Sequence, residues 1–598
     1  MERNGLDDRK ILLAVICKSK SEMQQQFDVI KSLRTFRVSD TFKVEFSTTL
    51  YFKSMAATCN YIRQNNDAKY IIFITAPIVA LEENIFTLII KTFFTYPKVG
   101  IIGLMGSEIP LSGDCTQAKN IYGTYFYMDE ANQLQAFIGK MPIFYQSVHV
   151  VDPCFFVTSE YILFDERIGD DFFIAAQCCR YRQSGYDVGV IHSENVLVIF
   201  AKDNCMYFKQ NVDDENYKSP LHSFKALYKD DVTPLVSICI PTYNQPKFFE
   251  TALQGALSQT YDNIEIIVGD DSTNEDTKEL IQPYLKRYAN IKYFHHGKPL
   301  GGRGLKNVTF IVNKSSGKYI NVLFHDDEIY PTKISRMMEY FIRDLENKIV
   351  LTTSARNEIN EKDEVTKRMN PWQPSRDVIL SGEDVGRKIL FAIENFIGEL
   401  STVLLKRESL LSKDPETGEK IFDIGIFCGV KDVVYGDMST WLNVLKSGGE
   451  CVFIKDVLSA FRKHSAQNGD NPVVRARLPL EFMGYITISW LNGIFLRNFD
   501  EYKTCCKHWD MFFFGSSYFK EMLDDAPDDI KFSTNVLEEL HRFITAEKYD
   551  AALDCSIKFL LDMLSQNNSI RPLIKRNAQT GLWEKADDGI MLHGMLRC

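Results

Sequence analysis

Continuous apolar runs alternate with longer amphipathic stretches through the first third of the chain. Short runs of this kind predict strands that are buried on both faces. The runs are residues 11–17 (ILLAVIC), 70–74 and 99–104. The stretches at 54–65 and 84–94 are long enough for helices. This alternation predicts an α/β layer domain over residues 1–202.

A second α/β pattern begins at Leu235, after a polar segment over 203–233 whose weak periodicity we interpret as a linker. The segment 246–259 has apolar residues on one helical face. Strands are predicted at 235–240, 264–269, 291–294, 318–324 and 348–354. Further helices are predicted at 273–288 and in the segment that follows the glycine-rich loop and ends near residue 314. We therefore expect a second α/β domain over residues 234–474.

From about residue 475 the pattern becomes helical. Helices are predicted at 480–496, 499–514, 535–544 and 549–564. The segment 545–562 resembles half of a helix-pair repeat, but a single unit does not establish an array. We favour a plain helical bundle as the C-terminal domain over residues 475–598.

Composition narrows the class of protein. The chain has 598 residues and a net charge of −10, which argues against nucleic-acid binding. Its most apolar stretch, 70–80, is about half of the roughly 20 residues that span a bilayer. No signal peptide is recognised at the N-terminus, and the 14 cysteines show no C-x-x-C spacing, as expected for reduced thiols. We expect a cytoplasmic protein without a transmembrane segment, at most peripheral at the inner face of the membrane, with homo-oligomerisation left open.

Polar motifs follow two of the predicted strands directly. PTYN (241–244) follows the first strand of the second domain, and GDDS (269–272) follows the next. Open α/β sheets bind ligands at these strand ends. Asp270 and Asp271 could accept hydrogen bonds from a base NH and a ribose hydroxyl, or could simply cap a turn.

A glycine-rich loop and an acidic loop come next. The glycines of LGGRGLKN (300–307) permit close backbone approach, and the helix that follows favours phosphate at its N-terminus. A dinucleotide fingerprint fails at Asn307, and no Walker lysine motif exists. HDDE (325–328) joins three carboxylates that repel one another unless Mg²⁺ or Mn²⁺ neutralises them, or unless the loop is a solvated turn.

Two further motifs lie downstream. GDMSTW (436–441) opens a predicted helix, where Asp437 could be a general base or an N-cap. LSAFRKHSAQ (458–467) contains His464, which could bind a metal or a phosphate, or could be an ordinary loop histidine.

Taken in order, these motifs resemble those of the family 2 glycosyltransferases, which have a GT-A nucleotide-sugar fold. The resemblance covers about 234–470 and includes FIGELSTVLLKRESL (396–410), between the metal loop and the base. It implies nucleotide-sugar contacts from Pro241, Thr242, Tyr243, Asn244, Asp270, Asp271, Arg303, Asn307, Asp326 and Arg462. It implies metal ligation by Asp326, Asp327, Glu328 and His464, a catalytic base at Asp437, and an acceptor side at Glu399 and Trp441.

The chain departs from the family at one position of the metal loop. Phe324 stands where one alignment has an earlier aspartate, so which two carboxylates ligate stays open. The reaction implied is metal-dependent, inverting transfer from a UDP- or dTDP-linked sugar, with Mn²⁺ or Mg²⁺, to a glycan, lipid-linked or protein hydroxyl. The alternatives are a nucleotidyltransferase and a non-catalytic scaffold that binds nucleotide sugars.

The N-terminal region also looks like a GT-A domain. The segments that carry this likeness are 99–107, 150–173 and 181–193. Its strand 70–75 runs into Ala76-Pro77-Ile78-Val79, which has no carboxylate to neutralise a metal. We therefore predict a catalytically silent domain; the alternative is an active domain whose acids are Asp170 and Asp171.

Overall fold

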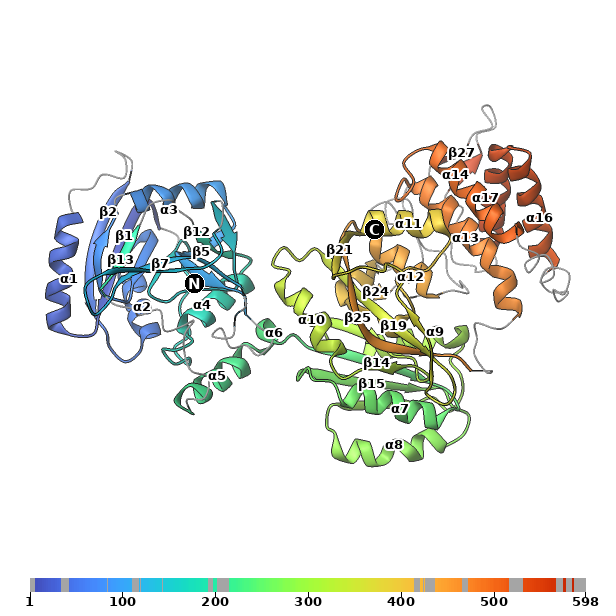
Figure 1. Cartoon of the computed structure of the whole chain (residues 1–598), viewed down its shortest axis with the longest axis horizontal. Coiled ribbons are helices and arrows are strands. Elements are labelled where there is room, and N and C mark those ends of the chain that lie inside the picture. The colour runs from blue at the N-terminus through green and yellow to red at the C-terminus, as the bar shows by residue number, and fades with distance from the viewer. Residues whose placement is uncertain are drawn as a thin grey trace. The chain divides into compact units, whose positions relative to one another are not determined.

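The computed structural model of the chain describes most of its residues (Figure 1). The described ranges are 6–33, 42–82, 84–109, 118, 120–141, 144–191, 197–201, 215–413, 420–422, 424, 436–464, 472–515, 531–565, 574–576 and 583–585. The chain forms two compact units, Met1–Pro234 with Ile342–Glu346, and Leu235–Phe341 with Asn347–Cys598.

The first unit is built on a seven-stranded sheet in the order β2-β1-β3-β11-β5-β12-β9. Its strands are β1 (Asp7–Cys17), β2 (Lys43–Leu50), β3 (Ala68–Ile74), β5 (Val99–Gly103), β9 (Tyr145–Ser147), β11 (Phe155–Thr158) and β12 (Asp187–Ile191). A second sheet contains β4 (Ile78–Leu81), β6 (Met105–Ser107), β7 (Ile121–Met128), β8 (Leu134–Ile138), β10 (Val150–Val151) and β13 (Val198–Phe200). The helices are α1 (Lys20–Leu33), α2 (Met55–Gln64), α3 (Asn84–Thr95) and α4 (Phe173–Gln183). The predicted α/β pattern is confirmed.

The segment predicted as a linker is partly helical. It contains α5 (Glu215–Leu227) and α6 (Lys229–Val232), while residues 202–214 lie outside the described part. Phe224, Tyr228 and Val232, spaced four apart, are buried in the core of the first unit. The sequence pattern does not reveal this stripe, because the residues around it are polar and charged.

The second unit is built on a ten-stranded sheet in the order β16-β15-β14-β17-β22-β19-β25-β18, with β20 and β21 on β19 and β25. Its strands are β14 (Val236–Thr242), β15 (Ile264–Asp270), β16 (Ile291–His295), β17 (Tyr319–Val322), β18 (Glu328–Ile329), β19 (Ile349–Ile359), β20 (Val365–Met369), β21 (Val378–Ser381), β22 (Leu404–Lys406) and β25 (Glu450–Arg462). Two short hairpins are β23 (Leu411–Lys413) with β24 (Lys420–Phe422), and β26 (Ile574–Arg576) with β27 (Trp583–Lys585).

Helices flank this sheet. They are α7 (Pro246–Leu257), α8 (Asp276–Arg287), α9 (Leu305–Lys314), α10 (Lys333–Arg343), α11 (Gly382–Ala392) and α12 (Gly436–Leu445). Helix α9 packs on β14 and β15, and α7 lies beside α8 (Figure 1).

The two units repeat one strand topology. The order β2-β1-β3-β11-β5-β12 of the first unit matches β15-β14-β17-β22-β19-β25 of the second. Strand directions agree as well: β1 is parallel to β2 and β3, and β14 to β15 and β17. In each unit the next two pairings are antiparallel and the last is parallel. Positions in one unit can therefore be compared with positions in the other.

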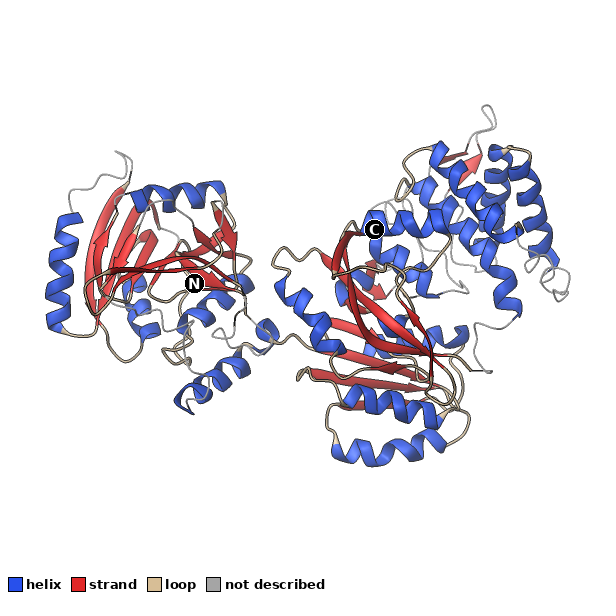
Figure 2. Ribbon diagram, viewed as in Figure 1, coloured by secondary structure: helices blue, strands red, loops and turns tan. Residues whose placement is uncertain are grey.

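The C-terminal helices share a hydrophobic core with the helices of the second sheet. They are α13 (Pro472–Asn492), α14 (Phe499–Phe514), α16 (Lys531–Thr545) and α17 (Tyr549–Ser565), and Figure 2 shows them grouped beyond the strands. Trp441 of α12 and Trp509 of α14 belong to this one core. A Cβ at Gly386 of α11 would lie 2.3 Å from the Phe495 ring, so the contact is backbone to ring.

Among the described residues, no helix is both long enough and apolar enough to cross a bilayer.

We predict that Trp509→Ala lowers the free energy of unfolding of the second unit by about 3–5 kcal/mol. Trp509 is fully buried, and its indole N–H donates to the Pro479 carbonyl at 2.7 Å, so the substitution leaves both a cavity and an unpaired carbonyl. Met511→Ala on the same helix is the control, because Met511 is exposed. Equal denaturant midpoints for the two variants would contradict the shared core.

Candidate functional site

The carboxyl ends of β14 and β15 lie side by side. The register pairs Thr242 with Asp270, and the Asp271 amide donates to the Thr242 carbonyl at 3.0 Å. The Thr242 hydroxyl oxygen is buried and has no hydrogen-bond partner, whereas Tyr243 is 46% exposed. Asn244 accepts from the Thr273 amide at 3.0 Å and so ties PTYN to the loop after β15. The structure thus brings the two predicted motifs together.

Asp270 is fully buried and is held by its own neighbours. Its carboxylate accepts from the Ser272 amide at 2.8 Å and from the Tyr293 hydroxyl at 2.6 Å, and His295 Nδ1 lies at 3.3 Å. Burial and this carboxylate raise the pKa of Tyr293. Tyr293 and His295 were missed in the sequence, although their alternate spacing at the end of a strand places them on one face.

The glycine-rich loop has an unusual backbone. Residues 301–304 all have positive φ, from 50° at Arg303 to 94° at Gly301, and α9 begins directly after them. Three of the four are glycines, which adopt such angles without steric cost. The loop therefore carries Arg303 at the start of a helix, where its guanidinium and the free amides could meet an anion.

Asn307 of α9 reaches across to β15. Its Nδ2 donates to the Gly269 carbonyl at 2.8 Å, and its Oδ1 would lie 2.1 Å from a Cβ at Gly269. Gly269 is therefore required for this approach. The Asn307 Oδ1 atom is buried without a hydrogen-bond partner and adjoins the strand end that carries Asp270.

The three consecutive carboxylates of the acidic loop have different partners. Asp326 contacts His464 Nε2 at 3.0 Å, and this contact raises the pKa of His464. Asp327 turns inward and accepts from the Arg462 amide at 3.0 Å. Burial, with the charge of Asp326, raises the pKa of Asp327 well above its usual value. Glu328 pairs with the Arg462 guanidinium at 2.7 Å. Only Asp326 is joined to the predicted histidine ligand.

Arg462 braces this loop from within. It is 1% exposed, and its guanidinium donates to the carbonyls of Asp326 at 2.8 Å and Asn360 at 2.9 Å, as well as to Glu328. The reason is that β25 continues to Arg462 between β18 and β19, which directs this side chain inward. The predicted diphosphate contact of Arg462 stays a prediction. Gln467, the last residue of that motif, lies outside the described residues.

A buried lysine that sequence analysis missed lies beside the acidic loop. Lys333, the first residue of α10, is fully buried and donates to the Ser401 carbonyl. Burial lowers its pKa to about 7, and the nearby Asp327 charge offsets part of that effect. A lysine opening an amphipathic helix gives no sequence signal of burial.

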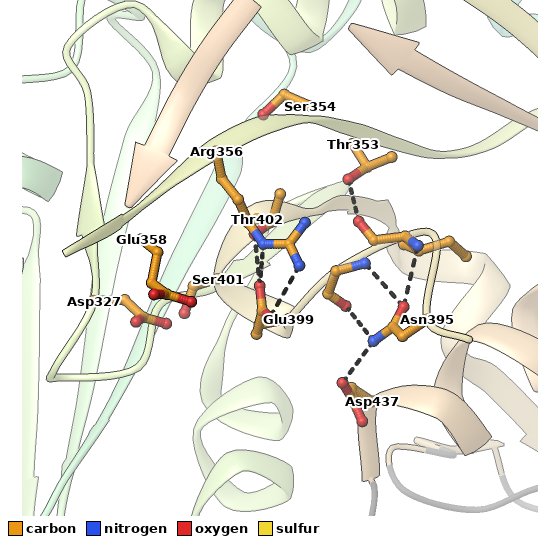
Figure 3. A network of polar contacts seen from close by, with 12 residues as sticks. Asp327, Thr353, Ser354, Arg356, Glu358, Asn395, Glu399, Ser401, Thr402 and Asp437 are labelled. Atoms are coloured by element: carbon orange, nitrogen blue, oxygen red, sulfur yellow. Dashed lines mark hydrogen bonds and ion pairs between the residues drawn. The ribbon is translucent and has the colours of Figure 1, made fainter. Parts of the chain in front are cut away.

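Asp437 lies apart from the acidic loop, at the start of α12 (Figure 3). Its Oδ2 accepts from Asn395 Nδ2 at 2.9 Å and its Oδ1 from the Met438 amide at 2.8 Å. Burial, and then the charge of Glu399, raise the pKa of Asp437 to about 6. A carboxylate tuned in this way suits proton transfer near neutral pH.

The predicted acceptor-side residues have distinct placements. Glu399 is bound at two points by the buried Arg356, with Nε at 2.5 Å and Nη2 at 3.0 Å (Figure 3). Trp441 is fully buried, and its indole N–H donates to the Gly398 carbonyl at 2.9 Å. Its ring therefore supports the turn that leads to Glu399 and is not open to an acceptor.

The corresponding positions of the first unit carry different chemistry. After β3, the Thr75 hydroxyl donates to the Pro153 carbonyl, and Gln26 makes hydrogen bonds to both the amide and the carbonyl of Ile78. Asp170, which precedes α4 as Asp437 opens α12, accepts from the Tyr51 hydroxyl and the Met55 amide, both at 2.7 Å. In the last register pair of β1 and β2, Leu50 stands where Asp270 stands in the second unit.

Family models match both units. A model described as "Glycosyltransferase like family" matches residues 13–222, and "Glycosyl transferase family 2" matches residues 237–398. The chain belongs to the family 2 glycosyltransferases. The first unit is a domain of the same kind, and the tandem GT-A architecture expected from the motifs is confirmed.

Curated relatives of this glycosyltransferase chain match it over short segments. An uncharacterized glycosyltransferase of Rickettsia felis is 36% identical over 138 residues, covering 23% of this chain and 22% of that protein. A Campylobacter jejuni GalNAc(5)-diNAcBac-PP-undecaprenol beta-1,3-glucosyltransferase is 33% identical over 107 residues, covering 18% and 34%. The chain thus spans about a fifth to a third of the length of these two relatives.

Two solved structures are similar to this glycosyltransferase chain at low identity. S. aureus TarS 1-349 in complex with UDP-GlcNAc is 13% identical with a TM-score of 0.37, covering 59% of this chain and 97% of that one. The mannosyltransferase PcManGT from Pyrobaculum calidifontis, in complex with GDP-Man and Mn²⁺, is 13% identical with a TM-score of 0.30, covering 56% and 87%.

We predict that Arg462→Ala lowers the free energy of unfolding by about 3 kcal/mol or more, because it leaves Glu328 without its buried partner. Thermal unfolding followed by circular dichroism measures the loss. Lys463→Ala is the control: Lys463 is mostly exposed, and its ion pair with Glu358 contributes about 1 kcal/mol or less. A stability of Arg462→Ala equal to that of the control would refute the bracing role.

Proposed function

We propose that the second unit transfers a sugar from a nucleotide-diphosphate sugar to an acceptor hydroxyl. The observation that carries the proposal is the separation of its carboxylates into two kinds. Asp326 is paired with His464 in the acidic loop, whereas Asp437 is held by Asn395 at the start of α12 with its pKa raised to about 6. The first kind suits a cation beside a diphosphate, and the second suits a general base.

In this proposal the reaction is a single displacement. Asp437 takes the proton of the acceptor hydroxyl while the acceptor oxygen bonds to the anomeric carbon. The nucleoside diphosphate leaves with the electron pair of the broken bond, so the anomeric configuration inverts. Thr242, Tyr243 and Asp270 hold the nucleobase of the donor. Arg303 and Asn307 lie toward its diphosphate.

A divalent cation fits the acidic loop with few protein ligands. Asp326 and His464 would hold Mn²⁺ or Mg²⁺, while Asp327 and Glu328 are turned to Arg462. Within the described residues no three His, Cys, Asp or Glu side chains form a ready metal site, so diphosphate oxygens would complete the coordination. When bound, the cation supplies charge neutralisation for the leaving group.

The donor and acceptor are proposed at the level of chemical class. We propose a UDP- or dTDP-linked donor and a glycan, lipid-linked or protein hydroxyl acceptor. Similarity to the Campylobacter jejuni GalNAc(5)-diNAcBac-PP-undecaprenol beta-1,3-glucosyltransferase supports a glycan or lipid-linked acceptor over a protein.

We propose that the first unit, with its boundary near 202 to 234, is catalytically silent and serves architecture, acceptor binding or dimerisation. Support comes from the lack of a carboxylate after β3 and from Gln26, which holds the Ile78 backbone at that position. Asp170 is the first unit's candidate for a catalytic base, but its carboxylate accepts a hydrogen bond from the Met55 amide at the start of α2. The helical region from about 475 onward supports the second unit through the shared core.

We predict that Asp437→Asn lowers the rate of transfer by about 10²- to 10⁴-fold, the usual contribution of a general base. Donor binding should be unchanged, because Asn has the size of Asp and Asp437 is not among the proposed nucleotide contacts. Transfer from radiolabelled nucleotide sugars and calorimetric UDP binding measure the two effects. Asp262→Asn, at an exposed position in the same unit, is the control. Ordinary turnover by Asp437→Asn would refute the assignment of the base.

We predict that Asp326→Asn abolishes Mn²⁺-dependent nucleotide binding and donor hydrolysis, because it removes the ligand paired with His464. Asp170→Asn should keep both activities and lower only the melting temperature, since Tyr51 and Met55 lose part of their acceptor. Thermal-shift titrations with UDP, with and without Mn²⁺, separate the outcomes. Hydrolysis that survives Asp326→Asn and is lost in Asp170→Asn would place the active centre in the first unit.

A further inference from the structure

Asn395 follows α11 and forms the centre of a tight turn (Figure 3). Its Oδ1 accepts from the backbone amides of Ile397 at 3.1 Å and Gly398 at 2.9 Å. Its Nδ2 donates to the Gly398 carbonyl at 3.1 Å and to Asp437 Oδ2 at 2.9 Å. One side chain thus shapes the turn and contacts the carboxylate.

The orientation of this amide is fixed by the backbone. Two N–H groups point at the oxygen of Asn395, and an N–H cannot pair with the amide NH₂. The nitrogen must therefore face Asp437, so Asn395 is a donor to that carboxylate. Hydrogen bonds from a neutral donor favour the ionised form of a carboxyl group.

The turn is anchored from two further elements. The Thr353 hydroxyl of β19 donates to the Ile397 carbonyl at 2.6 Å, and the Trp441 indole donates to the Gly398 carbonyl at 2.9 Å. Trp441 is one helical turn along α12 from Asp437. Helix α12 is therefore joined to this turn at two points, which fixes the place of Asn395 relative to the carboxylate.

We propose that Asn395 is a positioning residue for the reaction, a role that rests on the proposed function of Asp437 as the base. Asn395 and the Met438 amide occupy one acceptor site on each Asp437 oxygen. They hold the carboxylate in one orientation and leave its other lone pairs for the proton of an acceptor hydroxyl.

Several charged or titratable groups near Asp437 act on its proton affinity. Glu399 raises the pKa of Asp437, while Arg356 of β19 lowers it. Tyr485 of α13 is buried within the influence of the carboxylate, and burial raises the pKa of this phenol well above its usual value, so it is neutral. Arg356 and Glu399 bind each other directly, so a substitution of either one changes both charges near Asp437. The hydrogen bond from the neutral Asn395 can instead be replaced by a repulsive contact with a single substitution.

The test is Asn395→Asp, which keeps the shape and the oxygen that accepts from residues 397 and 398, but replaces the donor by a second carboxylate. In the wild-type protein we expect kcat/KM to fall tenfold per pH unit below about pH 6, because the base must be ionised. This fall is the acidic limb of the pH profile. In Asn395→Asp the acidic limb should move to higher pH by at least about one unit, since a facing carboxylate raises the pKa of Asp437. The substrate is the nucleotide sugar hydrolysed or transferred by the wild-type chain.

Two comparisons isolate the effect. Asn313→Asp, an exposed position on α9 with the same change in charge, should leave the limb in place. Asn395→Ala tests the case in which the aspartate variant does not fold. It removes the donor to Asp437 together with the oxygen that accepts from residues 397 and 398, but it adds no charge, so the fall in kcat/KM should still move to higher pH, by less than in Asn395→Asp. The KM for the donor should stay within about twofold in both Asn395 variants.

The outcomes separate this proposal from the proposed function. If Asp437→Asn is active, the base assignment itself fails. If Asp437→Asn is inactive but the limb stays in place in folded Asn395→Asp or Asn395→Ala, only the role of Asn395 is overturned. A loss of stability with an unmoved limb would show a structural role alone.

Discussion

Three carboxylates that follow one another at the end of a strand repel, and the second unit is organised around keeping them apart. Asp326 contacts the His464 imidazole, Asp327 the Arg462 amide and Glu328 the Arg462 guanidinium, so all three contacts depend on the end of β25 and the two residues that follow it. Since β25 also pairs with β18 and β19, its register fixes where the guanidinium and the imidazole lie. The acidic loop is thus shaped by a strand more than 130 positions later in the chain.

Asp437 is held by elements other than those that hold the acidic loop. Asp437 is removed from the acidic loop by its place on α12, and the indole of Trp441 ties this helix to the turn at 395–398. The helix is held in turn by a core that includes the C-terminal helices. Two groups of acids can coexist in one unit because different elements hold them, and each group has its own charge partner, Arg462 in one case and Arg356 in the other.

Sequence patterns located most of the fold because buried strands and amphipathic helices are local features. The strands at 11–17 and 235–240 and the helix at 499–514 follow from periodicity alone. Helices α5 and α6 were not predicted, because their buried residues Phe224, Tyr228 and Val232 stand in a polar background. At the candidate site, motif order singles out Asp270, Asp326 and Asp437, whose roles stay predictions, whereas it does not single out Lys333, Asn395 and Tyr293, which lie beside them. Their importance comes from partners on distant elements, which no local pattern records.

The pairing of Gln26 with Ile78 has a consequence for any attempt to build an acidic loop into the first unit. The two hydrogen bonds fill the space after β3 with a side chain from α1, and Leu50 replaces the acid at the neighbouring strand end. Restoring a single aspartate after β3 would therefore meet an occupied position and an apolar neighbour. One substitution could therefore not give the first unit an acidic loop like that at 325–328, because Gln26 and Leu50 would have to change with it.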